Sequence, residues 1–146
     1  MIGPTTIAQA VTGDAKHSAS PDQSHYVNDV VIRIATPNGS GSQSANNALM
    51  RSILTMGVPV SSKNLFPSNI QGLPTWFTIR ANEQGWQSAR NRTDLCIAMN
   101  PQSAAEDIAE LGPGAMLIVR ESLKHLVARD DLVVFVVPFN KIVNTV

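Results

Sequence analysis

Short apolar runs alternate with helical patterns along most of this chain, and together they predict an α/β fold. Runs rich in β-branched and other apolar residues have the length of buried strands. They lie at 29–36, 58–63, 75–81, 94–99, 115–119 and 132–137. Apolar side chains at helical spacing predict helices over 42–56 and 100–111, and a shorter one over 122–129. In the first of these helices Ala45, Leu49, Ile53 and Met56 are expected to form the buried face. Strands that alternate with helices predict a three-layer sandwich around a largely parallel central sheet.

The N-terminal segment lacks such a pattern. Residues 1–26 are rich in Thr, Ser, Ala, Asp, Gln and Gly and show no sustained hydrophobic period. They predict a flexible arm in front of one domain over 27–146. A chain of 146 residues is long enough for one such domain with a real core.

The charge balance and hydrophobicity of the chain argue against nucleic acid and membrane as partners. Eleven basic residues balance eleven acidic ones, only 15% of residues are charged, and 43% are hydrophobic. A nucleic-acid binder usually carries a basic stripe, so we expect no nucleic acid. The sequence contains no run of the roughly 18 apolar residues needed to span a membrane, so we expect no membrane either. The low charge is also compatible with a surface that another protein partly covers.

The chain contains one cysteine, Cys96, in an apolar run. A single cysteine excludes an internal disulfide and a cysteine-rich metal or iron–sulfur site built from this chain alone. We therefore expect Cys96 to be a small core residue and the protein to work in a reducing cytoplasm.

A glycine- and serine-rich turn follows the first predicted strand. Residues 38–42, Asn-Gly-Ser-Gly-Ser, lead into the first helix, and Ser40 or Ser42 is the expected N-cap. Amides at the start of a helix favour anions, above all phosphate groups. The turn is not a P-loop, and Ser44 stands where a full G-x-G-x-x-G motif needs glycine. Two interpretations stay open: a phosphate-binding turn, or a tight turn with a structural role only.

Two further segments begin at predicted strand ends. Lys63 opens an apolar, proline-containing loop and is the only charged residue between Met56 and Ile79. It is either a handle for a carboxylate or phosphate, or a lysine whose amine simply reaches solvent. Asn100 and Pro101 are expected to begin the second helix. Because ligands of α/β folds bind at the carboxyl ends of strands, we expect the three segments to share one crevice.

The sequence offers no pair of nucleophile and base at recognisable spacing. His125 is the one histidine outside the N-terminal segment. Glu106, Asp107 and Glu110 are expected on the polar, solvent-exposed face of a helix. We therefore expect a domain that binds a ligand or completes a larger enzyme, inactive on its own.

These segments together resemble the gamma-type domain of 2-oxoacid:ferredoxin oxidoreductases. The likeness rests on the glycine turn, on residues 63–76 (Lys-Asn-Leu-Phe-Pro-Ser-Asn-Ile-Gln-Gly-Leu-Pro-Thr-Trp) and on Ala-Met-Asn-Pro at 98–101. It covers about Val27 to Val146 and is greatest to the alpha subunit of 2-oxoglutarate:ferredoxin oxidoreductase. The resemblance implies oxidative decarboxylation of a 2-oxoacid to an acyl-CoA with reduction of ferredoxin, or the reverse, CO₂-fixing reaction of a TCA-type cycle.

The resemblance also implies cofactors, partners and site residues. Thiamine diphosphate, Mg²⁺ and a [4Fe–4S] cluster would belong to other domains or subunits, while this domain covers the active site and helps bind CoA and substrate. The glycine turn would meet CoA phosphates, and Lys63 would neutralise a CoA phosphate or the distal carboxylate of 2-oxoglutarate. The residues implied to bind substrate or CoA, or to shape that site, are Gly39, Ser40, Gly41, Ser42, Lys63, Asn64, Pro67, Ser68, Gln71 and Asn100.

Two departures from the family pattern qualify the likeness. Gln-Gly-Leu at 71–73 stands where many relatives carry Arg-Gly-Gly, which points to the 2-oxoglutarate enzymes. The family's domain also normally runs further, so this polypeptide is expected to be either a separate subunit or a piece of a longer one. From the residues alone, a non-catalytic nucleotide-binding or regulatory module of the same layout is the alternative.

Overall fold

The computed structural model describes residues 28–66, 70–88 and 90–144. The predicted arm over 1–26 and two of the expected site residues, Pro67 and Ser68, lie outside the described residues.

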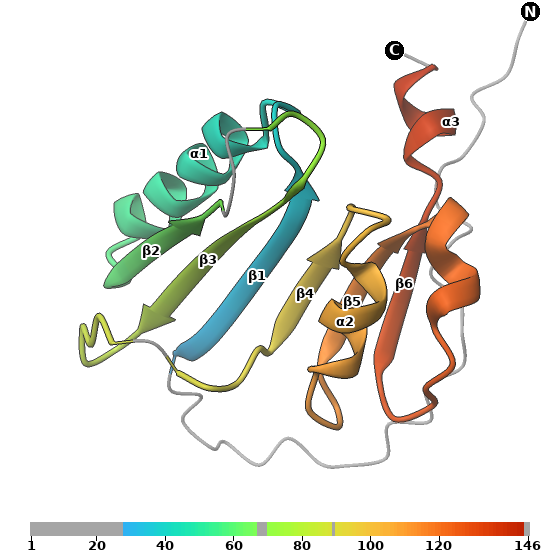
Figure 1. Ribbon diagram of the computed structural model, residues 1–146. Helices are drawn as coiled ribbons and strands as arrows, with labels where there is room; N and C mark the ends of the chain where they lie inside the picture. The colour runs from blue at the N-terminus through green and yellow to red at the C-terminus, as the bar shows by residue number, and fades with distance from the viewer. Residues whose placement is uncertain (1–27, 67–69, 89, 145–146) are drawn as a thin grey trace, which may run out of the picture.

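A six-stranded sheet forms the centre of the fold, with strand order β2-β3-β1-β4-β5-β6 (Figure 1). Strand β3 pairs antiparallel with β1 and β2, whereas the pairs β1–β4, β4–β5 and β5–β6 are parallel. Every strand but β3 therefore runs in the same direction, which confirms the predicted α/β class with a mostly parallel sheet. The strands are β1 (Asp29–Pro37), β2 (Val60–Leu65), β3 (Pro74–Asn82), β4 (Leu95–Ala98), β5 (Met116–Arg120) and β6 (Val133–Val137).

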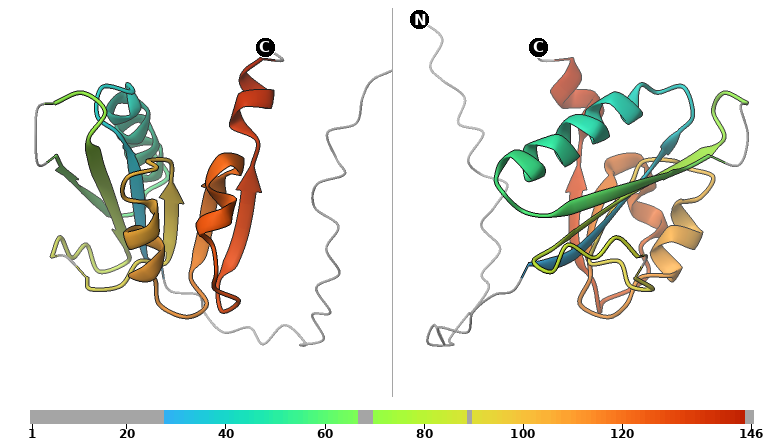
Figure 2. Two further views of the ribbon diagram at one scale, coloured as in Figure 1. Left: turned by 45° about the vertical axis from the view of Figure 1, so that its right-hand side comes forward. Right: turned by 90° about the vertical axis from the view of Figure 1, so that its left-hand side faces the viewer.

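Helices lie on both faces of this sheet, which gives the predicted three layers (Figure 2). Helix α1 (Ser42–Thr55) packs against β2 and β3 on one face. Helix α2 (Ala104–Ala109) and the 3₁₀ helix η2 (Glu121–Leu126) cover β4, β5 and β6 on the other face. Helix α3 (Phe139–Val143), which the sequence pattern did not predict, follows β6.

The core is divided between the two faces because side chains alternate along each strand. Residues of β4 and β5, with Cys96 and Leu117 fully buried, pack against α2 and η2. On the other face Ile34, Phe77 and Ile79 form a smaller cluster with side chains from α1. The expectation that Cys96 is a buried core residue is therefore confirmed.

The predicted apolar face of the first helix is mostly wrong. Ala45, Leu49 and Met56 were expected to point inward, yet all three are exposed. The helix instead turns Asn46 and Met50 toward the sheet, together with Ile53 from the predicted set. Neighbouring residues are about 100° apart around a helix, so a rotation of one position replaces the buried set. The rotation places a polar residue, Asn46, over the sheet beside a cavity.

The α1 side of the sheet is covered only in part. Helix α1 contacts β2 and β3, and no helix of the described part of the chain lies over β5 and β6 on that side (Figure 1). Met116 and Val133 lie in register there, as do Ile118 and Phe135. Met116, Val133 and Phe135 are exposed by 40%, 48% and 50%. On this open apolar face, contact with further protein would bury apolar side chains that are now exposed to solvent.

None of the helices among the described residues is both long enough and apolar enough to cross a membrane.

Candidate functional site

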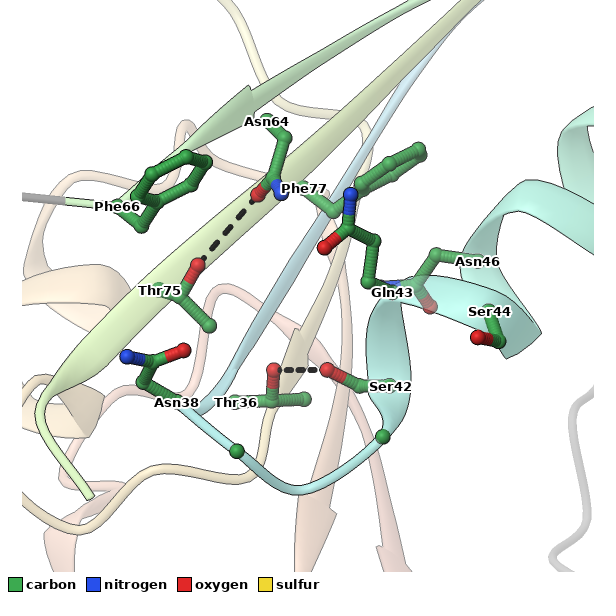
Figure 3. A pocket seen from close by; sticks show the side chains of 12 residues that line it. Thr36, Asn38, Ser42, Gln43, Ser44, Asn46, Asn64, Phe66, Thr75 and Phe77 are labelled. Carbon is green, nitrogen blue, oxygen red and sulfur yellow. Dashed lines mark hydrogen bonds between the residues drawn. The ribbon is translucent and has the colours of Figure 1, made fainter. Parts of the chain in front are cut away.

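The glycine turn borders a cavity of about 500 Å³ at the carboxyl ends of β1 and β2 (Figure 3). Both strands are antiparallel to β3, so their carboxyl ends meet at one edge of the sheet. The cavity lies on the α1 face, and its described lining residues are all uncharged. Hydroxyl and amide side chains from three elements and the turn point toward it: Thr36, Asn38, Ser42, Gln43, Asn46 and Asn64.

The backbone of the turn presents hydrogen-bond donors at this cavity. Gly41 is the N-cap of α1, with φ +76°, and no side chain caps the helix. Among the described residues we find no acceptor for the amides of Gly41, Ser42 and Gln43. The prediction that Ser40 or Ser42 caps the helix is wrong, because Ser42 Oγ instead lies 2.7 Å from Thr36 Oγ1 on β1. The first turn of α1 therefore offers free N–H groups and the positive end of the helix dipole.

The glycine turn is hydrogen-bonded to the loop that precedes β3. For these two segments, the expectation that they lie side by side therefore agrees with the structure. The amide of Asn38 donates to the Leu73 carbonyl (2.8 Å), and the amide of Gly72 donates to the Asn38 carbonyl (2.9 Å). The Gln71 side chain lies against Gly39: a Cβ built on Gly39 would be 3.1 Å from Gln71 Cγ. Gly39 has a φ of +82°, so glycine suits both the conformation and the close approach.

Asn64 is the predicted loop residue that reaches the cavity. It lies on β2 opposite Phe77 of β3, and both side chains line the cavity. Thr75 Oγ1 donates to Asn64 Oδ1 at 3.4 Å and to the Leu65 carbonyl at 3.1 Å. Ser40, in contrast, is exposed and does not contribute to the lining.

Lys63 does not share this cavity, so the expectation that it acts together with the glycine turn is wrong. Lys63 lies within β2 and not at a strand end, in register with Thr78 of β3, which is itself in register with Arg33 of β1. These side chains line cavities on the α2 face. Successive residues of a strand point to opposite faces, so Asn64 and Lys63 are separated by the sheet.

Asn100 is also placed differently from the expectation. Helix α2 begins at Ala104 with Ser103 as N-cap, and residues 100–103 form a turn before it. Asn100 is fully buried, and its Oδ1 accepts the amide of Gln102 at 2.8 Å. It is absent from the described lining of the glycine-turn cavity. Asn100 and Pro101 thus belong to a turn that follows β4, in which the Asn100 side chain accepts a backbone amide, and α2 begins after this turn.

A buried carboxylate on α2 was missed from the sequence. Asp107 was placed on a polar helix face, yet it is only 3% exposed, and its Oδ1 accepts the indole N–H of Trp76 at 2.8 Å. Burial raises the pKa of Asp107, against the opposing effect of the nearby Ser103 hydroxyl and of the hydrogen bond from Trp76. The pair connects α2 to β3 across the α2 face. No sequence signal distinguishes Asp107 from its exposed neighbours Glu106 and Glu110.

Within residues 28–66, 70–88 and 90–144, no group of three His, Cys, Asp or Glu side chains is arranged to hold a metal ion. The described lining of the glycine-turn cavity combines neutral polar side chains and the turn backbone with the apolar side chains of Phe66 and Phe77.

Comparison with known proteins identifies the fold and the family. A family model described as pyruvate ferredoxin/flavodoxin oxidoreductase matches residues 31–146. The chain is 30% identical over 112 residues to 2-oxoglutarate oxidoreductase subunit KorA of Mycobacterium tuberculosis, which covers 73% of this chain and 17% of that protein. It superposes with a TM-score of 0.73 and 17% identity on 2-oxoglutarate:ferredoxin oxidoreductase from Magnetococcus marinus, solved with 2-oxoglutarate, coenzyme A and succinyl-CoA bound.

That superposition covers 81% of this chain and 21% of the Magnetococcus marinus chain. Pyruvate oxidoreductase subunit PORC from Thermotoga maritima superposes with a TM-score of 0.65 and 17% identity over 81% of this chain and 66% of that chain. The chain spans less than a fifth of the length of the curated relatives that it matches, 17% and 14%. From the match over residues 31–146, this chain belongs to the pyruvate ferredoxin/flavodoxin oxidoreductase family.

Proposed function

We propose that this chain is a subunit or domain of a 2-oxoacid:ferredoxin oxidoreductase, in which it covers the active site and helps to bind CoA. The observation that carries the CoA role is the cavity at the glycine turn, where the amides of Gly41, Ser42 and Gln43 begin α1 with no acceptor among the described residues. A helix start of this kind binds phosphate groups through N–H donors and the helix dipole without needing a basic side chain.

The remaining lining suits the uncharged part of the same ligand. CoA carries a pantetheine arm with two amides, and Asn38, Asn46 and Asn64 supply amide side chains along the cavity. Phe66 and Phe77 add apolar surface at its wall. The proposal assigns the phosphate groups to the turn and the amides of the arm to the asparagine side chains.

We infer 2-oxoglutarate as the substrate from the match to the Mycobacterium tuberculosis subunit and from Gln-Gly-Leu at 71–73. Thiamine diphosphate, Mg²⁺ and the [4Fe–4S] cluster are assigned to other domains or subunits. Cys96 is the single cysteine of the chain, whereas a [4Fe–4S] cluster is held by four cysteine thiolates. When bound, those groups supply the decarboxylation and the electron transfer to ferredoxin. We propose that the open apolar face over β5 and β6 contacts the domains or subunits that hold these cofactors. We place the assembly in the cytoplasm.

Purification of the tagged chain from its native host tests the assignment to a larger enzyme. We expect a brown complex that reduces ferredoxin with 2-oxoglutarate and CoA. A colourless chain without partners that binds a nucleotide by itself would instead support the regulatory module considered from the sequence.

A substitution in the cavity tests the CoA role in that complex. Asn64→Ala should raise the KM for CoA about 2- to 10-fold, which corresponds to one neutral hydrogen bond of about 0.5–1.5 kcal/mol. Asn28→Ala is the matched control, because Asn28 is exposed at the opposite end of β1. An equal effect of both substitutions on the KM for CoA would remove Asn64 from the binding site.

A further inference from the structure

A second cavity of about 500 Å³ lies on the opposite face of the sheet from the glycine turn. The polar sides of β1, β2 and β3 form its floor, and residues of the segment between β3 and β4 form its wall. Its charged lining residues, among those that the structure describes, are all cations: Arg33, Lys63, Arg80 and Arg90. We call this cavity the cationic groove.

Strand register places the groups of the groove in rows. Lys63, Thr78 and Arg33 are neighbours across β2, β3 and β1, and Ser61 is paired with Arg80 one row further along. Hydroxyl donors thus alternate with cationic side chains on the floor. A row of this kind can surround the oxygens of an anion from more than one side.

The positive charge of the groove is only partly neutralised. Arg33 pairs with Glu110 (2.6 Å), while Arg80 and Arg90 share Asp29 at 3.6 Å and 2.6 Å. Lys63 has no ion pair with any described residue, although Glu106, Asp107 and Glu110 line the neighbouring cavity. Within the described part of the chain, the four cations of the groove thus form ion pairs with two carboxylates, which is two fewer than the number of cations.

Arg80 is held in place before any ligand binds. It is buried, its guanidinium donates to the Ser88 carbonyl, and its charged end lies 5.9 Å from the centre of the Trp86 ring. A fixed guanidinium loses little conformational entropy when an anion arrives, in contrast to a cation on a mobile side chain. Lys63 is exposed and supplies the adjustable charge.

We propose that the cationic groove binds a compact dianion, a phosphate group or a small dicarboxylate, at a site separate from the glycine-turn cavity. The charge calls for about two negative charges, and the volume lies in the range of small-molecule sites. Lys63 and Arg80 contact the anion, and Ser61 and Thr78 donate hydroxyl hydrogen bonds to it. This site does not depend on the proposed CoA role.

An NMR titration of the ¹⁵N-labelled full chain tests the site, with inorganic phosphate and succinate as separate probes at constant ionic strength. We expect saturable shifts of the Ser61, Lys63 and Thr78 amides, and the probe that binds more tightly identifies the phosphate or dicarboxylate source. Lys63→Met should weaken binding at least about tenfold, the effect of losing one charge-assisted contact. Lys124→Met removes the same charge from an exposed site on η2 and should change the affinity little.

Three results would overturn the site. One is an equal loss of affinity in Lys63→Met and Lys124→Met, which would indicate a net-charge effect only. Another is a saturable shift confined to the amides of 41–43, which would place all anion binding at the glycine turn. The third is saturation of the groove by a polyglutamate peptide but by neither small dianion, which would assign the surface to an acidic protein partner. If the assembled enzyme shows no CoA-dependent activity, the proposed function fails, but the result of this titration still decides whether the cationic groove binds an anion.

Discussion

Replacing Gly39 by alanine should destabilise the protein more than replacing Gly41, although both glycines have positive φ angles of +82° and +76°. An L-residue in this left-handed region costs about 1–2 kcal/mol, and that cost applies to both positions. The surroundings differ: a Cβ on Gly39 would meet Gln71 Cγ at 3.1 Å, whereas a Cβ on Gly41 would meet nothing within 4 Å.

The additional loss of stability at position 39 depends on whether the Gln71 side chain can move away from the new methyl group. Gln71 is exposed, so its side chain can move into a less favourable rotamer at a cost of about 0.5–1.5 kcal/mol. We therefore expect Gly41→Ala to lower the free energy of unfolding by about 1–2 kcal/mol and Gly39→Ala by about 1.5–3.5 kcal/mol.

Urea unfolding followed by tryptophan fluorescence measures these differences, and Gln71→Ala completes a double-mutant cycle. Removing the Gln71 side chain should abolish the additional cost of Gly39→Ala and leave the cost of Gly41→Ala unchanged. Equal destabilisation by the two alanines, or coupling of Gln71 to Gly41 instead of Gly39, would refute this account of the turn.

Four further predictions concern the core and the open face. Because burial raises the pKa of Asp107, the stability that its protonated form contributes is complete below about pH 3.8 and is lost as pH rises through the folded-state pKa. Asp107→Asn should therefore be more stable than the wild type at neutral pH. It should also make the free energy of unfolding depend less on pH above pH 4, as urea titrations at several pH values would show. Trp76→Phe removes the indole donor to Asp107 and should cost about 1.5–3 kcal/mol in the same assay, with a further rise in the Asp107 pKa by NMR. Burial raises the pKa of Cys96 to about 12, so a disulfide reagent should label it at pH 8 only on unfolding, and rapid labelling of the native chain would contradict its burial. Phe135→Asp on the open face should leave the unfolding midpoint nearly unchanged but reduce co-purification of partner subunits; unchanged recovery of partners would exclude this face as the interface.

The elements of the fold followed closely from local pattern. Each predicted strand has its counterpart in the sheet, within a few residues at the ends. The run at 94–99 is an example: its apolar residues produced β4, a short buried strand between β1 and β5. Strong periodicity over such runs leaves few alternatives to a strand.

Positions within the elements were harder to predict. The apolar side chains at 45, 49 and 56 gave the wrong inner face for α1, because the αL conformation of Gly41 and the packing over β2 and β3 fix the rotation of the helix. Asp107 similarly became a buried partner of Trp76, although its helix reads as polar at that position. Both outcomes depend on what lies across the interface, and a single segment carries no information about that.

The candidate site shows the same division. The sequence alone determined that a glycine turn ends a buried strand and that a specific loop motif follows, since both depend on residue type and spacing. Only the tertiary structure decided that Asn64 and Gln71 join the turn whereas Lys63 does not. The physical reason is the pleat of β2: adjacent side chains of a strand point to opposite faces, and pairing with β3 fixes which face belongs to the turn.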